Sequence, residues 1–180
     1  MKKRLLLHIC CAPDATVSVE RLLPGYDITC YFFNPNIHPD EEYHLRLSEA
    51  QRLARDMNIP LAWGDYSSTL WMEAVRGLED EPEGGKRCEA CFLFRLDGTA
   101  KYAAQHGFEA FSTVLTVSPH KNADTINKIG SEIGRRYGLE FLCLDLKKKD
   151  GFGRSVELSK HYKLYRQNYC GCLFSKTKRK

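Results

Sequence analysis

Apolar positions along the chain alternate between short continuous runs and longer stretches with helical spacing. The short runs are typical of buried parallel strands and predict strands at residues 4–11, 27–33, 60–63, 109–115 and 140–146. The helical spacing predicts helices at residues 14–23, 41–57, 68–78, 91–107, 122–137 and 154–167. Because strands and helices alternate over residues 1–180 without a long linker, the sequence predicts a single three-layer α/β domain.

The most economical sheet for this alternation is Rossmann-like, of the HUP-like type, with five parallel strands in the order 3-2-1-4-5. In such a sheet the ligand crevice opens at the carboxyl ends of the strands, beside strand one. Cys10, Cys11 and Asp14 stand at that end of strand one, and His120 and Lys121 follow strand four. No glycine-rich phosphate loop follows strand one, which argues against the use of ATP.

Cysteine spacing is the strongest chemical signal. Six of the eight cysteines form three close pairs, which are Cys10-Cys11, Cys88-x-x-Cys91 and Cys170-Gly171-Cys172. A [4Fe-4S] cluster takes four thiolates. The remaining two thiolates and the Asp14 carboxylate would suit a mononuclear iron with an open position. Because neighbouring side chains on a strand point to opposite faces, Cys10 and Cys11 are expected to serve separate centres.

Other interpretations of these residues stay open. A structural zinc site would also use four cysteines, and Cys170 and Cys172 could form a redox dithiol. Cys88 and Cys91 are expected to straddle the start of a helix. The thiols of Cys30 and Cys143 fall within predicted strands and are expected in the core. His8 is expected to be a core histidine with satisfied ring nitrogens, and Asp14 could be the N-cap of the next helix.

Charge is concentrated near the end of the chain. Residues 145–180 carry eleven Lys/Arg and three Asp/Glu, a net charge of +8, which leaves −4 for the rest of the +4 chain. Such a block favours a polyanion such as nucleic acid, although a solvated helix face and a basic tail would give the same count. No apolar run reaches the length of a membrane span, and a cytoplasmic protein with reduced cysteines is expected.

Four segments together resemble one known family. They are LLHICCAPD (6–14), GGKRCEACFLFRL (84–96), FSTVLTVSPHKN (111–122) and KKKDGFGRSVELSKHYKLYRQNYCGCLFS (147–175). In this order and with these flanks, the three cysteine pairs are similar to those of the cobalamin-independent epoxyqueuosine reductases, the QueH type.

The resemblance implies an oxidoreductase that reduces the epoxide of epoxyqueuosine, at the wobble position of tRNA, to queuosine. It implies a [4Fe-4S] cluster and an adjacent iron, the first supplying electrons and the second acting as Lewis acid on the epoxide. Our preferred division places Cys88, Cys91 and two further cysteines on the cluster, and the other two with Asp14 on the iron. His120 and Tyr169 are candidate proton donors.

The tRNA is the expected partner, together with an unidentified electron donor of the ferredoxin or flavodoxin type. Expected tRNA contacts are Lys121, Lys147, Lys148, Arg154, Lys176, Lys178 and Arg179. Two other functions stay open from the sequence. One is an iron–sulfur enzyme that thiolates tRNA on the same fold, and the other is a non-catalytic RNA-binding module stabilised by zinc.

Overall fold

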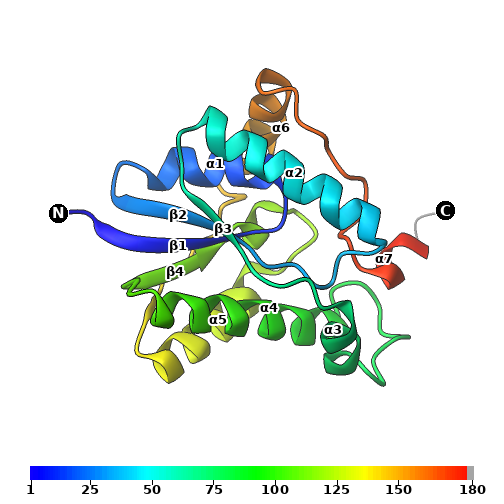
Figure 1. The fold of residues 1–180 in the computed structure, drawn as a ribbon. Helices are drawn as coiled ribbons and strands as arrows, with labels where there is room; N and C mark the ends of the chain where they lie inside the picture. The colour runs from blue at the N-terminus through cyan, green and yellow to red at the C-terminus, as the bar shows by residue number, and fades with distance from the viewer. Residues whose placement is uncertain (178–180) are drawn as a thin grey trace.

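A parallel five-stranded sheet forms the centre of the computed structural model, which describes residues 1–177 (Figure 1). Its strands are β1 (Lys3–Ile9), β2 (Tyr26–Phe32), β3 (Leu61–Trp63), β4 (Ala110–Thr113) and β5 (Glu140–Phe141). All neighbours pair in parallel in the order β3-β2-β1-β4-β5, which confirms the predicted topology. The chain therefore changes direction across the sheet beside β1, where a ligand crevice is expected.

Helices cover both faces of the sheet, as Figure 1 shows. One face carries α1 (Ala12–Leu22), α2 (Asp40–Asp56) and α6 (Gly151–His161), and the other carries α4 (Lys86–Gln105) and α5 (Ala123–Tyr137). Three shorter elements complete the described chain, namely α3 (Ser68–Ala74), the 3-10 helix η1 (Val114–Val117) and α7 (Leu173–Thr177). In Figure 1 both α3 and α7 lie toward the carboxyl ends of the strands.

Strand β1 is the middle of the core. Leu5, Leu6 and Leu7 are fully buried, as expected for a strand covered on both faces. His8 is also fully buried, with Nδ1 2.9 Å from the Thr113 hydroxyl and Nε2 3.2 Å from the Phe33 carbonyl. Burial lowers the pKa of His8 well below its usual value, so the ring is neutral. The interpretation of His8 as a satisfied core histidine is confirmed.

The predicted element boundaries are wrong at the start of two helices. Strand β1 ends at Ile9 and α1 begins at Ala12, because Pro13 fits the first turn of a helix, where its missing N–H costs nothing. Helix α4 begins at Lys86, so Cys88 and Cys91 both lie inside it and do not straddle its start.

The prediction for Cys143 is also wrong. Strand β5 ends at Phe141, so Cys143 lies beyond the sheet and is exposed, with its sulfur 3.2 Å from the Ser131 hydroxyl. Cys30 is buried in β2 as predicted, and burial raises the pKa of its thiol to about 12.

The C-terminal part departs furthest from the predicted pattern. Helix α6 spans Gly151–His161 rather than residues 154–167, and α7 has no counterpart among the predicted helices. Residues 162–172 instead form an irregular segment that leads to the last cysteine pair. Within residues 1–177, every helix is too short or too polar to cross a bilayer.

Candidate metal centre

The turn between β1 and α1 brings three metal-ligating side chains together. Cys10 lies in a bend, Cys11 is the N-cap residue of α1, and Asp14 is in the first turn of that helix. The two sulfurs are 3.9 Å apart, and the ligand atoms of all three residues lie within 4.8 Å of one another. All three side chains are buried. These three donors can therefore hold a single metal ion.

This geometry corrects the expectation that Cys10 and Cys11 serve separate centres. That expectation assumed a strand that continued through Cys11, whereas the chain turns at Cys10 and the two sulfurs converge. The structure also excludes the capping role for Asp14, because Cys11 occupies the N-cap position and no side-chain cap bond is formed there.

The second pair lies on α4. Cys88 and Cys91 are three residues apart in a helix, which places them on one face. The half-buried Cys88 sulfur accepts a hydrogen bond from the Gly84 N–H at 3.2 Å. Cys91 is buried in a small apolar cluster with Trp71, Val75 and Cys172. The second and third cysteine pairs therefore meet in the folded chain.

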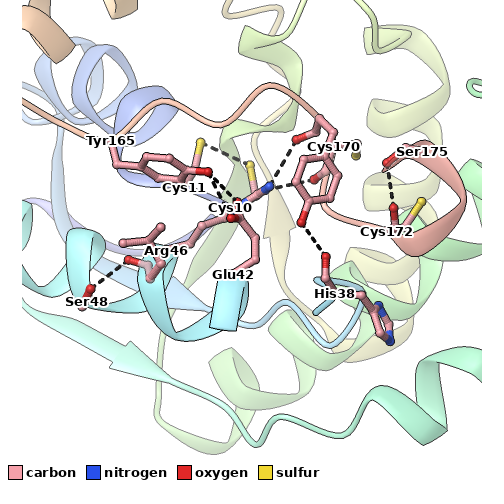
Figure 2. A network of polar contacts seen from close by, with 12 residues as sticks. Cys10, Cys11, His38, Glu42, Arg46, Ser48, Tyr165, Cys170, Cys172 and Ser175 are labelled. Carbon is pink, nitrogen blue, oxygen red and sulfur yellow. Dashed lines mark hydrogen bonds and ion pairs between the residues drawn. The ribbon is translucent and has the colours of Figure 1, made fainter. Parts of the chain in front are cut away.

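Backbone contacts of the irregular segment position the third pair, as Figure 2 shows. The buried guanidinium of Arg46 on α2 donates to the carbonyls of Tyr169 and Cys170, at 3.2 and 3.1 Å. The Gly171 carbonyl accepts from the His38 N–H at 2.8 Å. Helix α2 therefore serves as the template on which the Cys170–Cys172 turn is built.

Further polar groups of α2 hold the same segment (Figure 2). Glu42 pairs with Arg46 at 2.6 Å and accepts a hydrogen bond from the Tyr165 hydroxyl. Glu49 accepts from the Tyr165 N–H, and Arg52 donates to the carbonyls of residues 162 and 163. Sequence reasoning missed these residues, although one signal was available: Arg46 is a charged residue that the helix places on its buried face.

Gly171 is required by the turn that it forms. Its φ of +121° lies in a region that L side chains rarely adopt, and an added Cβ would lie 3.0 Å from Ile37 and 3.1 Å from Arg46. Gly171→Ala is therefore expected to displace the neighbouring sulfurs and to lower the iron content of the purified protein at least about twofold. Gly77→Ala is the matched control, because Gly77 has φ +82° but no atom within 4 Å of the added Cβ. Equal iron content in the two variants, measured by colorimetric assay, would contradict this role for Gly171.

Cationic side chains surround the sulfurs. The hydrogen bond shared with Cys11 lowers the pKa of the Cys10 thiol to about 5, with help from the charges of Arg95 and Lys121 and against the effect of burial. Burial, followed by the charge of Cys10, raises the pKa of the Asp14 carboxyl to about 7. Burial disfavours the charged form of Lys121, but the charges of Cys170, Cys10 and Asp14 outweigh it and raise its pKa, so the ammonium stays charged. This environment suits anionic ligands.

A cavity of about 180 Å³ opens beside the first metal-ligating group. Its walls include Cys10, Asp14, His120, Lys121, Tyr169 and Cys170. His120 is exposed, whereas Tyr169 is buried and its hydroxyl donates to the His38 carbonyl. Burial raises the pKa of Tyr169 to about 12. The structure thus brings both candidate proton donors to the cavity, with the Tyr169 proton already engaged.

The expected tRNA contacts differ in their surroundings. Arg154 forms ion pairs with Glu20 and Glu157, and Lys147 pairs with Asp145. Lys148 and Lys176 are exposed, and the Lys176 ammonium lies 5.7 Å from the centre of the Tyr169 ring. Lys178 and Arg179 lie outside the described residues. The positive charge of Lys176 therefore lies beside Tyr169, one of the residues that line the cavity.

The donor set fits iron or an iron–sulfur group. Six thiols in three pairs and one buried carboxylate offer soft and hard ligands, and the sulfurs lie among buried cations. Two buried N–H groups near Cys91, the Trp71 indole N–H and the Arg95 Nε–H, form no hydrogen bond of full geometry among the described residues, although the indole approaches the Cys91 thiol. Orphaned donors of this kind are expected where sulfur atoms of a bound group complete the hydrogen bonding.

The family model and the related sequences that match this chain all carry the same description. A family model described as epoxyqueuosine reductase QueH matches residues 5–178. The chain is 44% identical over 181 residues to the epoxyqueuosine reductase QueH of Streptococcus pyogenes serotype M1, covering 97% of this chain and 71% of that relative. It is 39% identical to the protein of the same name from Thermotoga maritima, covering 98% of this chain and 92% of the relative.

Solved structures with a similar fold are more distant in sequence. A predicted subunit of tRNA methyltransferase from Methanocaldococcus jannaschii superposes with a TM-score of 0.57 at 11% identity, covering 87% of this chain and 74% of that chain. The U34-tRNA thiolase NcsA from Methanococcus maripaludis, solved with its [4Fe-4S] cluster, also gives 0.57 at 11% identity, covering 97% of this chain and 62% of that chain. At this identity the likeness concerns the fold alone.

Proposed function

The chain belongs to the QueH family of epoxyqueuosine reductases, and on that premise we propose that its paired cysteines and Asp14 hold a [4Fe-4S] cluster and a mononuclear iron. As a member of this family it is an oxidoreductase of tRNA queuosine processing, which reduces epoxyqueuosine. The observation that supports the second metal is the convergence of Cys10, Cys11 and Asp14, whose ligand atoms lie within 4.8 Å of one another.

We assign Cys10, Cys11 and Asp14 to the iron, and Cys88, Cys91, Cys170 and Cys172 to the cluster. The second assignment is supported by the burial of Cys91 with Cys172 and by the shared charge interactions of Cys88 with the Cys170–Cys172 pair. Bound at these residues, the cluster would supply single electrons and the iron would act as a Lewis acid toward the epoxide oxygen.

The chain's own residues then bind the substrate and handle its charge. The cavity beside Asp14 is large enough for a substituted five-membered ring but not for a whole nucleoside, so we propose that the epoxide-bearing ring enters it and the base stays outside. The Lys121 ammonium lines the cavity and would stabilise negative charge on the leaving oxygen.

Proton delivery is assigned to His120. It lines the same cavity as Asp14 and is exposed, so it can exchange its proton with solvent. Tyr169 is the second candidate for the proton donor. It ranks behind His120 because its hydroxyl proton is already donated to the His38 carbonyl and because burial raises its pKa, which makes the proton harder to release. The electron donor is proposed to be of the ferredoxin or flavodoxin type.

The decisive experiment is anaerobic incubation with tRNA that carries epoxyqueuosine and a strong chemical reductant, followed by nucleoside analysis. Conversion to queuosine by brown, iron-loaded protein is expected. Colourless protein that contains zinc and leaves the nucleoside unchanged would instead support the RNA-binding module. ATP-dependent incorporation of sulfur into tRNA would support the thiolating enzyme.

Binding of tRNA is expected to depend on exposed lysines of the basic segment that begins at residue 145. Lys148→Gln combined with Lys176→Gln removes two positive charges, so the slope of log affinity against log salt should become shallower by about 1.5. Filter binding over a range of salt concentrations measures this slope. The matched control is Lys2→Gln with Lys3→Gln at the opposite end of β1, which should leave the slope unchanged. Equal slopes in both double variants would remove Lys148 and Lys176 from the tRNA interface.

A further inference from the structure

Arg95 on α4 is a buried cation in an unusual environment. Its side chain is 1% exposed, and it forms no ion pair with a carboxylate among residues 1–177. One guanidinium nitrogen donates to the Asn34 side-chain oxygen at 2.6 Å, and another lies 4.0 Å from the Cys91 sulfur. Its Nε has no hydrogen-bond partner in the described part of the chain. The neutral amide of Asn34 cannot balance the charge.

A buried charge without a counter-ion is strongly unfavourable, so a fold that retains one must supply negative charge nearby. The sulfur-bearing residues that interact with the charge of Arg95 are Cys91, Cys10 and Cys170, and their sulfurs would carry negative charge as metal-bound thiolates. They come from α4, from the end of β1 and from the C-terminal segment, so Arg95 lies between the two proposed ligand sets. Its counter-charge is therefore the metal-binding sulfur itself.

Trp71 supplies a second N–H donor at the same place. The side chain is fully buried in the cluster that contains Cys91 and Cys172, and its indole N–H approaches the Cys91 thiol without forming a hydrogen bond of full geometry among the described groups. An indole N–H is rarely buried without an acceptor. Sulfur atoms of a group bound by these cysteines would provide that acceptor.

We propose that Arg95 is a positioning residue that sets the reduction potential of the cluster held by Cys91. The Trp71 N–H is the second hydrogen-bond donor to the sulfur of that cluster. A positive charge and hydrogen bonds to sulfur stabilise the more negative, reduced form, so they raise the potential. A cluster with a higher reduction potential can be reduced by a weaker electron donor. This inference rests on the cluster assignment proposed above.

The test is redox titration of the anaerobically loaded protein, followed by visible absorbance and electron paramagnetic resonance. In Arg95→Met, the equilibrium constant for one-electron reduction is expected to fall at least tenfold, which is about 59 mV toward negative potential. Arg95→Gln, which keeps a donor for the Asn34 oxygen, should show the same fall. Arg95→Lys keeps the charge, so its equilibrium constant for reduction should fall less. Trp71→Phe keeps the packing and should show a smaller fall in the same direction.

The outcomes separate this inference from the proposed function. Wild-type protein without a cluster would refute the cluster assignment itself. An unchanged potential in a loaded neutral variant at position 95 would overturn the role of Arg95, and an unchanged potential in Trp71→Phe would overturn the role of the indole. If neither neutral variant binds iron although circular dichroism shows a folded protein, Arg95 is required for cluster assembly and the tuning role is refuted.

Discussion

Cys91→Ala is expected to abolish both the iron–sulfur absorbance near roughly 400 nm and all measurable epoxide reduction. Cys91 is 7% exposed and packs against Cys172, so a replacement ligand from solvent or from another part of the chain has no direct access to its position. Alanine fits the same helix without strain, and the metal-free protein should fold. Absorbance, iron content and nucleoside analysis of the treated tRNA measure the three effects separately.

Two other cysteines serve as controls for this variant. Cys30→Ala removes a thiol that is equally buried but lies in β2, so it should keep the cluster and lose only about 1 kcal/mol of unfolding free energy. Cys143→Ala removes an exposed thiol and should change neither quantity. Full absorbance in Cys91→Ala would show that the pair on α4 does not bind the cluster.

The topology could be predicted because its strands are marked by composition. The three leucines at the middle of β1 are completely buried, and such continuous apolar runs are expected only in strands that are covered on both faces. The alternation with helices then leaves few possible strand orders. Strand length was less well marked. Strand β5 contains two residues, and the chain leaves the sheet soon after Leu142, whose N–H still donates to the Phe111 carbonyl of β4 at 3.0 Å.

The candidate ligands stand out in the sequence by their cysteine spacing, whereas their geometry could not be predicted. The side-chain directions of Cys10 and Cys11 depend on where β1 ends, and two further residues of strand would have separated their sulfurs. Pro13 fits both a strand end and the first turn of a helix, so local sequence does not decide between them.

The supporting residues depend on long-range contacts that no local pattern carries. Arg46 meets the carbonyl of Cys170 from 124 positions away in the sequence. The segment before Cys170 has helical spacing of tyrosines, yet α2 offers its backbone and side chains enough polar partners to hold them in an irregular path. Tertiary hydrogen bonds thus override the local helical preference.

Asp14→Asn is expected to remove close to one iron per chain and nearly all epoxide reduction, while the cluster absorbance stays. The amide preserves the size of the side chain, but it is neutral and a far poorer ligand for iron than a carboxylate. Cys10 and Cys11 alone would leave the ion with two protein ligands in place of three. Iron quantification against the absorbance of the cluster distinguishes loss of this iron from general loss of metal.

Asp124→Asn is the matched control for that variant. Asp124 also lies in the first turn of a helix, α5, so the substitution removes the same favourable interaction with the helix dipole at an exposed position outside the cavity. It should retain both the iron content and the turnover of the wild type. If Asp14→Asn behaves like Asp124→Asn, the carboxylate contributes only to the helix terminus. The second metal must then be held by Cys10 and Cys11 without it, and the convergence of the three side chains would have no role in the reaction.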